Sequence, residues 1–264
     1  METFTFDTEI EIANRTVLNS GLLLESATMD YYHKMEQETH TEYMVEATAR
    51  NIFDRIGHFF VNIIQAMRRF GVSIKEQVSA KLRTREMKRA VRGLHVKAEE
   101  LLKIGKKTME MPAFDEQSRV LESYANRLRK CCKKIVANEY KSTRKMDEDL
   151  EKFRALYEEA ERAFNEVSEK KVERPVKEVI KWVENQINGM DHTMTILDES
   201  LKDLEEMDRE VRRMHEKRTL YGADILPAHV GLIRRTITKF SNFIHNAIGK
   251  RMAKIISFAV FACA

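Results

Sequence analysis

Residues 49–70, ARNIFDRIGHFFVNIIQAMRRF, constrain the fold more than any other stretch of the chain. Large apolar side chains recur there at steps of three and four residues, which places them on one side of an α-helix. These residues are Ile52, Ile56, Phe59, Phe60, Ile63 and Met67. An isolated helix gains most of its stability by burying its apolar face. We therefore predict that this helix lies in the core and that other helices of the chain cover it.

A second stretch, residues 232–256, repeats this rhythm near the end of the chain, with Ile237, Phe240 and Ile244 among its apolar residues. Packing of the two apolar faces against each other is the simpler interpretation. The alternative is a membrane-surface protein, in which phenylalanines enter the lipid and arginines and lysines face outward. The phenylalanines concerned are Phe59, Phe60, Phe240 and Phe243. We prefer packing, and we do not expect a membrane partner.

Residues that break helices are scarce, since 264 residues include 9 glycines and 3 prolines, and 33% of the residues are charged. This composition is typical of long helices in bundles or coiled coils. A nucleotide-binding α/β fold would need glycines at tight turns and alternating strands and helices, which the sequence lacks. We predict an all-α fold, an elongated helical bundle with coiled-coil character and an extended N-terminal arm.

The predicted arm spans residues 1–18. Residues 3–12, TFTFDTEIEI, alternate apolar and polar side chains, a period of two that favours extended structure. The apolar side of this interaction arm consists of Phe4, Phe6, Ile10 and Ile12. No second stretch alternates convincingly. We therefore expect the arm to join the sheet edge of a neighbouring chain or to pack along helices.

Three further segments follow the arm. Residues 19–110 are predicted to form amphipathic and basic helices, with one helix ending at Gly71. Residues 113–222 are predicted to form a long charged helical hairpin or coiled coil, with a break near 138–143 and a new start at Arg174-Pro175, where the proline suits the first turn. Apolar residues from 179 to 214 then predict one continuous seam. Residues 225–264 form a basic amphipathic helix with an apolar tail.

Charge is segregated along the chain. The net charge is −8 over residues 1–49, +14 over 50–146, −8 over 147–224 and +6 over 225–264. Clustered bases without aromatic residues between 71 and 113 suit sequence-blind contact with a nucleic-acid backbone. The candidate residues are Lys75, Lys81, Arg83, Arg85, Lys88, Arg89, Arg92 and Lys97. The alternative, which we expect, is that residues 75–107 pair with the acidic helices at 147–216.

No motif predicts catalysis, a metal or a cofactor. His33, Glu36, Glu38, His40 and Glu42 crowd one stretch, but a di-metal bundle site would need Glu-x-x-His on two facing helices. The sequence has no HExxH, CxxC or glycine-rich phosphate loop. The bases around Cys131 and Cys132 would lower a thiol pKa, although buried structural cysteines are the default.

Three cysteines indicate a reducing compartment. The acidic N-terminus does not predict a signal peptide, and the absence of an apolar run of about 18 residues argues against a membrane span.

The order of features resembles internal or structural virion proteins of large tailed bacteriophages. An acidic arm precedes ESATMDYYHKMEQETHTEYMVEATARNIFDRIGHFFVNIIQAMRRF, and long charged helices follow. In such phages, acidic leaders are cut after a hydrophobic-x-Glu triplet, which Met44-Val45-Glu46 matches. The resemblance implies a non-enzymatic structural or assembly protein, located in the virion or the host cytoplasm. Its partners would be other protein chains, in an oligomer or a larger assembly.

Overall fold

Helices make up most of the described chain. The computed structural model describes residues 6–36, 42–103, 105, 107–189, 192–216 and 225–263. In this part the elements are α1 (Asp7–Glu36), α2 (Glu42–Leu82), α3 (Arg85–Lys103), β1 (Thr108–Pro112), α4 (Phe114–Ala137), α5 (Thr143–Glu169), β2 (Lys171–Pro175), α6 (Val176–Ile187), α7 (Thr193–Glu216) and α8 (Ile225–Cys263). The prediction of an all-α fold is confirmed.

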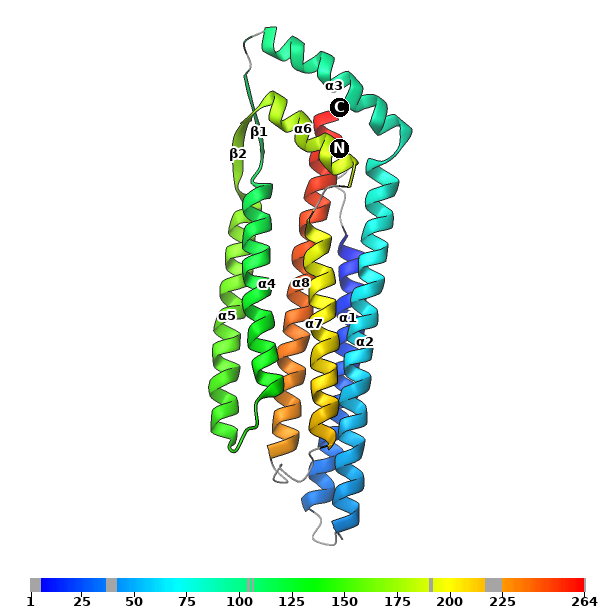
Figure 1. The fold of residues 1–264 in the computed structure, drawn as a ribbon, viewed down its shortest axis with the longest axis vertical. Helices are drawn as coiled ribbons and strands as arrows, with labels where there is room; N and C mark the ends of the chain where they lie inside the picture. Colours follow the sequence, from blue (N-terminus) through cyan, green and yellow to red (C-terminus); the bar gives the residue numbers. More distant parts are fainter. Residues whose placement is uncertain are drawn as a thin grey trace.

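The helices form an elongated bundle (Figure 1). α1, α2, α7 and α8 run side by side along the long axis, and the α4–α5 hairpin lies along α8. α3 and α6 cross one end of the bundle, where they contact each other. Because α8 contacts α1, α2, α4 and α5, it is the central helix.

One short antiparallel sheet was not predicted. β1 pairs with β2, so that Thr108 lies opposite Pro175 and Met111 lies opposite Val172. Each strand has only five residues and ends in proline, which gives a weak strand signal. The pair forms where the connections α3–α4 and α5–α6 meet at the same end of the bundle.

For residues 7–18, the prediction of an extended N-terminal arm was wrong. Helix α1 begins at Asp7, and Phe4 lies outside the described residues. Phe6 is buried, Ile10 packs against the core, and Ile12 is 57% exposed. Only part of the predicted apolar side therefore faces the core, because the residues follow a helical and not a strand period.

Contact with α8 stabilises the helical form of this segment. The buried residues Phe6, Ala13 and Val17 share one face of α1, with Ile10 beside them. At Gly249 of α8, an added Cβ would lie 2.4 Å from Cδ1 of Ile10. The missing side chain at this glycine lets α1 and α8 approach closely and bury the helical face of α1.

Two predicted helix boundaries were also wrong. α2 does not end at Gly71 but continues to Leu82. The predicted continuous seam over residues 179–214 is divided into α6 and α7. α6 ends just before Gly189, whose φ of +79° is a left-handed conformation that glycine adopts without strain.

The apolar face of α2 lies in the core. Ile52, Ile56, Phe59, Phe60, Ile63 and Met67 are each at most 1% exposed. The rings of Phe59 and Phe60 meet edge to face, with centroids 5.9 Å apart. Phe240 and Phe243 of α8 are buried too, so the four phenylalanines considered for membrane contact all lie inside the bundle. One continuous apolar cluster runs from Phe6 to Ala262 and joins the predicted segments.

Candidate functional site

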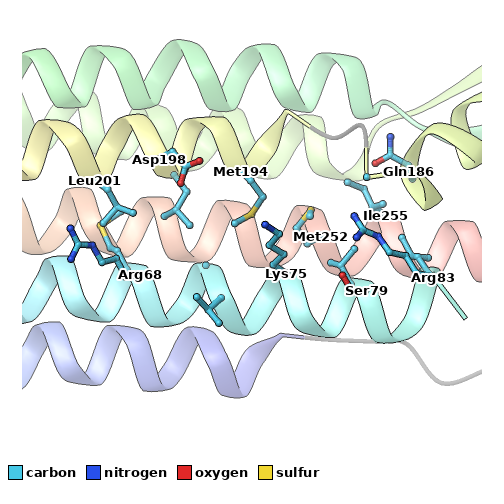
Figure 2. A pocket seen from close by; sticks show the side chains of 17 residues that line it. Arg68, Lys75, Ser79, Arg83, Gln186, Met194, Asp198, Leu201, Met252 and Ile255 are labelled. Atoms are coloured by element: carbon cyan, nitrogen blue, oxygen red, sulfur yellow. The ribbon is translucent and has the colours of Figure 1, made fainter.

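A cavity of about 530 Å³ opens between α2 and α7, and residues of α6 and α8 complete its lining (Figure 2). We call it the α2–α7 cavity. Much of its wall is apolar, and the apolar lining includes Met67, Met194, Leu197, Leu201, Met252 and Ile255. Its volume lies within the range of about 300–1,000 Å³ that small-molecule sites occupy.

The cavity arises from a mismatch in helix length and from one glycine. α7 begins at Thr193, whereas α2 continues to Leu82, so the last turns of α2 face the α6–α7 junction. At Gly71 an added Cβ would lie 2.7 Å from Cδ2 of Leu197, which shows how closely the two helices approach there. The helices touch at this glycine and leave space around it.

Polar groups line the cavity mainly from α2. Arg68, Lys75 and Arg83 contribute the positive charges. Arg68 is engaged, since its Nη2 lies 2.5 Å from Oε1 of Glu205. Asp198 of α7 is the one carboxylate among the described residues that line the cavity. Lys75 and Arg83 were predicted as phosphate contacts, but the enclosure around them was not.

The predicted nucleic-acid residues lie together at one end of the bundle. Lys75 and Lys81 are on the last turns of α2, Arg83 is in the link to α3, and the side chain of Lys97 is not described. The outer face of α3 contributes four exposed side chains, Arg85, Lys88, Arg89 and Arg92. We call these four residues the basic surface. They lie opposite the buried face of α3, which carries Met87, Val91 and Ala98.

For the four residues of the basic surface, the expected pairing with the acidic helices at 147–216 was wrong within the described part of the chain. No carboxylate lies within 4.0 Å of the basic surface in that part of the chain. α3 contacts α6 through His95, whose Nε2 lies 2.8 Å from Oε1 of Glu184. The acidic helices pair instead with bases of α2 and α4, namely Arg68–Glu205, Arg127–Glu159, Arg129–Asp203, Lys133–Asp203 and Lys133–Glu206.

The outer face of α1 is unusually apolar. Leu18, Leu22, Leu23 and Met29 are each more than 50% exposed. This face was not predicted. The available signal was the run Leu22-Leu23-Leu24, in which only Leu24 is buried.

A partly buried polar cluster joins α1 to α8. Nδ1 of His245 donates to Oδ1 of Asn14 at 3.1 Å, and Nδ2 of Asn14 donates to Oδ1 of Asn246 at 3.0 Å. Burial disfavours the charged imidazole and lowers the pKa of His245 to about 3. The ring also contacts Phe70, with centroids 4.8 Å apart. His245 is therefore a neutral core residue at ordinary pH.

The two adjacent cysteines are not activated. Burial raises the pKa of the Cys131 thiol, and it also raises the pKa of the fully buried Cys132. The thiol of Cys132 is 3.9 Å from the carbonyl oxygen of Thr236. This agrees with the structural interpretation of the pair and not with a reactive thiolate.

The suggested histidine–glutamate stretch at 33–42 has no described side chains. Among the residues that are described, no cluster of histidine, cysteine, aspartate or glutamate suits a metal ion. None of the helices in that same part is long and apolar enough to span a membrane. No protein-family model, curated protein or solved structure matches the chain.

Proposed function

We propose that this chain is a non-enzymatic structural protein that assembles with a second copy of itself through the outer face of α1. The exposed side chains of Leu18, Leu22, Leu23 and Met29 support this proposal. A solvated helix face is normally polar. Removing a leucine-sized side chain from water yields about 1.5–3 kcal/mol, so a partner that covers this face is favoured.

Two antiparallel copies of α1 are complementary along this face. Arg15, Leu18, Leu22 and Glu25 are separated by three, four and three residues, the steps of a coiled-coil contact. In one antiparallel register, Leu18 lies opposite Leu22 of the second copy, and Arg15 lies opposite Glu25 of the second copy. Glu25 contacts Arg234 in its own chain at 3.2 Å, and its side chain is 48% exposed.

The assembly that we propose is the virion of a tailed bacteriophage. The support is the resemblance of residues 20–70 to internal and structural virion proteins, a segment that includes part of the α1 face. An elongated bundle with a self-complementary helix suits repeated contacts between protein chains. On this proposal the protein resides in the virion or in the host cytoplasm.

Sedimentation velocity over a range of concentrations tests the self-association. We expect the full chain to form a dimer, and we expect the double variant Leu18→Asp, Leu22→Asp to remain monomeric. The matched control replaces Val72 and Val96, exposed apolar residues of α2 and α3, with aspartate. The proposal would be contradicted by a wild-type chain that is monomeric at every concentration. It would also be contradicted if the control variant lost as much dimer as the Leu18→Asp, Leu22→Asp variant.

Charge exchange tests the antiparallel register. Arg15→Glu should weaken the dimer, because it places like charges opposite each other on both sides of the leucines. The double variant Arg15→Glu, Glu25→Arg should restore it. Because Glu25→Arg also disturbs the contact with Arg234, the helical melt of that single variant is measured in parallel. A double variant that folds but stays as weak as Arg15→Glu would exclude this register.

A second candidate function is sequence-independent nucleic-acid binding, favoured by the basic surface. Its four cations occupy one exposed helix face and have no carboxylate partner among the described residues. Neutralised phosphates release counterions, and each contributes about 0.9 to the log–log salt slope for duplex DNA. Duplexes of unrelated sequence should therefore bind equally, with strong dependence on salt.

Neutralising the basic surface tests this candidate. Replacing Arg85, Lys88, Arg89 and Arg92 with glutamine should flatten the salt slope by up to about four units and leave the helical melt intact. The control replaces four exposed lysines elsewhere, Lys130, Lys134, Lys141 and Lys202. Fluorescence anisotropy with a labelled duplex provides the measurement. Absence of binding at low salt, or equal flattening in both variants, would reject this function.

A further inference from the structure

A polar row crosses the wall of the α2–α7 cavity. Lys75 and Ser79 are four residues apart on one side of α2, Arg83 follows directly after the end of that helix, and all three line the cavity. In Figure 2 the amino group of Lys75 points toward the methionine side chains of α7 and α8. Neither Lys75 nor Arg83 has a carboxylate within 4.0 Å in the described part of the chain. The row therefore presents two positive charges on either side of a hydroxyl.

An apolar channel continues from this row. Met194 and Met252 lie next to Lys75, and Met67 and Leu201 line the part further along α2 and α7. Methionine is flexible and polarisable, so such a wall adapts to an alkyl chain. Arg68 and Leu82, the last residue of α2, both line the cavity and are 14 residues of helix apart, or roughly 21 Å at about 1.5 Å per residue. The lining is thus elongated, with Lys75 and Arg83 toward one end and Arg68, which is paired with Glu205, toward the other.

We propose that the α2–α7 cavity binds a long-chain carboxylate of the fatty-acid class. The carboxylate accepts hydrogen bonds from Lys75, Ser79 and Arg83, and the alkyl chain lies between Met67 and Leu201. Charged donors make the strongest hydrogen bonds to carboxylates. Asp198 lies on the α7 side of the cavity, where its negative charge disfavours a head group and so directs it to the polar row. This inference does not depend on the proposed self-association.

Calorimetric titration of the full chain with dodecanoate, below its micelle concentration, tests the site. We expect saturable binding of one dodecanoate per chain. Lys75→Met should weaken it at least tenfold, because this variant keeps the apolar stem and removes the charge. Dodecanol should bind more weakly than dodecanoate to the wild type and equally to both proteins. Hexanoate should bind poorly, because it has the head group without the long chain.

Two controls separate a built site from general adsorption. Lys141→Met removes an exposed lysine outside the cavity and should leave the dodecanoate affinity unchanged. Met194→Trp fills the cavity and should abolish binding of both long-chain probes. If Met194→Trp does not fold, Lys75→Met with an unchanged helical melt still decides the question. Three results would overturn the proposal. They are heat that does not saturate, a loss of dodecanoate affinity in Lys141→Met equal to that in Lys75→Met, and a dodecanoate affinity that Lys75→Met leaves unchanged.

Discussion

The contacts α2–α8 and α4–α7 join long helices of the same bundle by different forces. Between α2 and α8 the contact is largely apolar, with Phe60 and Phe240 fully buried and the ring of Phe70 against that of His245. Between α4 and α7 an ionic row lies at the rim, where Arg129 and Asp203 approach to 2.8 Å. The two side chains of that pair retain 19% and 15% of their exposure.

The two contacts contribute differently, the apolar one mainly to stability and the ionic one mainly to the alignment of the helices. Apolar burial contributes about 25 cal/mol per Å² removed from water, and it does not specify register strongly. Surface ion pairs contribute about 0–1 kcal/mol each, but they favour one alignment of the helices and disfavour others. We infer that α2 and α8 hold the bundle together, and that the ionic row sets how the α4–α5 hairpin lies against α7.

The largest expected effect is that of Phe60→Asp. This change places an unpaired charge on the most buried face of α2, and we expect a loss of about 4 kcal/mol or more in the free energy of unfolding. Urea unfolding followed by circular dichroism measures it. His58→Asp, at an exposed position of the same helix, is the control. An unchanged melting temperature for Phe60→Asp would show that α2 does not carry the stability.

Two glycine-to-alanine changes sharpen the argument about close packing. Gly249→Ala drives a Cβ into Ile10 between α1 and α8, which should cost about 1–3 kcal/mol. Gly57→Ala has nothing within 4 Å and should stabilise α2 by up to about 1 kcal/mol through helix propensity. Opposite shifts of the urea midpoint are expected. Shifts of the same sign would mean that the α1–α8 contact is looser than described.

The core should also be sensitive to acid through His245. Its pKa of about 3 in the folded protein is below the ordinary value of 6.5, so only the unfolded chain takes up a proton between those values. Stability is therefore lost as the pH falls below about 6.5, and by pH 5.5 the loss is about 1.4 kcal/mol.

Urea titrations at pH 7.5 and 5.5 measure this loss. His229, whose pKa burial also lowers, acts in the same direction, so the wild type is compared with His245→Gln. The variant should lose less stability than the wild type over this interval. Equal losses in the two proteins would show that His245 is accessible to protons in the native state.

The smallest effect is expected in the ionic row. Arg129→Gln should cost less than about 1 kcal/mol, and the cost should shrink in high salt. A double-mutant cycle with Asp203→Asn, followed by urea unfolding at two salt concentrations, measures the coupling. A coupling of several kcal/mol that salt does not change would show that this ionic contact stabilises the fold as strongly as the apolar core does.

Much of the helical layout follows from local patterns. The three-and-four spacing located the apolar face of α2, and Pro175 marked the start of α6 at the next residue. Gly189 could have indicated the end of α6. The apolar residues on both sides of it keep a helical spacing, however, and so predicted one continuous helix. The α2–α7 cavity had no sequence signal of its own, because it depends on where α7 begins relative to the end of α2.

The sequence by itself determined that the chain is helical, because helix breakers are few and apolar residues recur with the helical period. Only the tertiary structure decided whether residues 6–12 form a strand or a helix. Phe6 and Ile10 fall on one side in either conformation, and the close approach of Ile10 to Gly249 of α8 favours the helix. The tertiary structure also decided which cations remain without carboxylates, because ion pairing depends on side chains more than 70 residues away, as for Arg129 and Asp203. Local patterns record the conformational preferences of a segment, whereas a neighbour from a distant part of the chain determines what that segment packs against and binds.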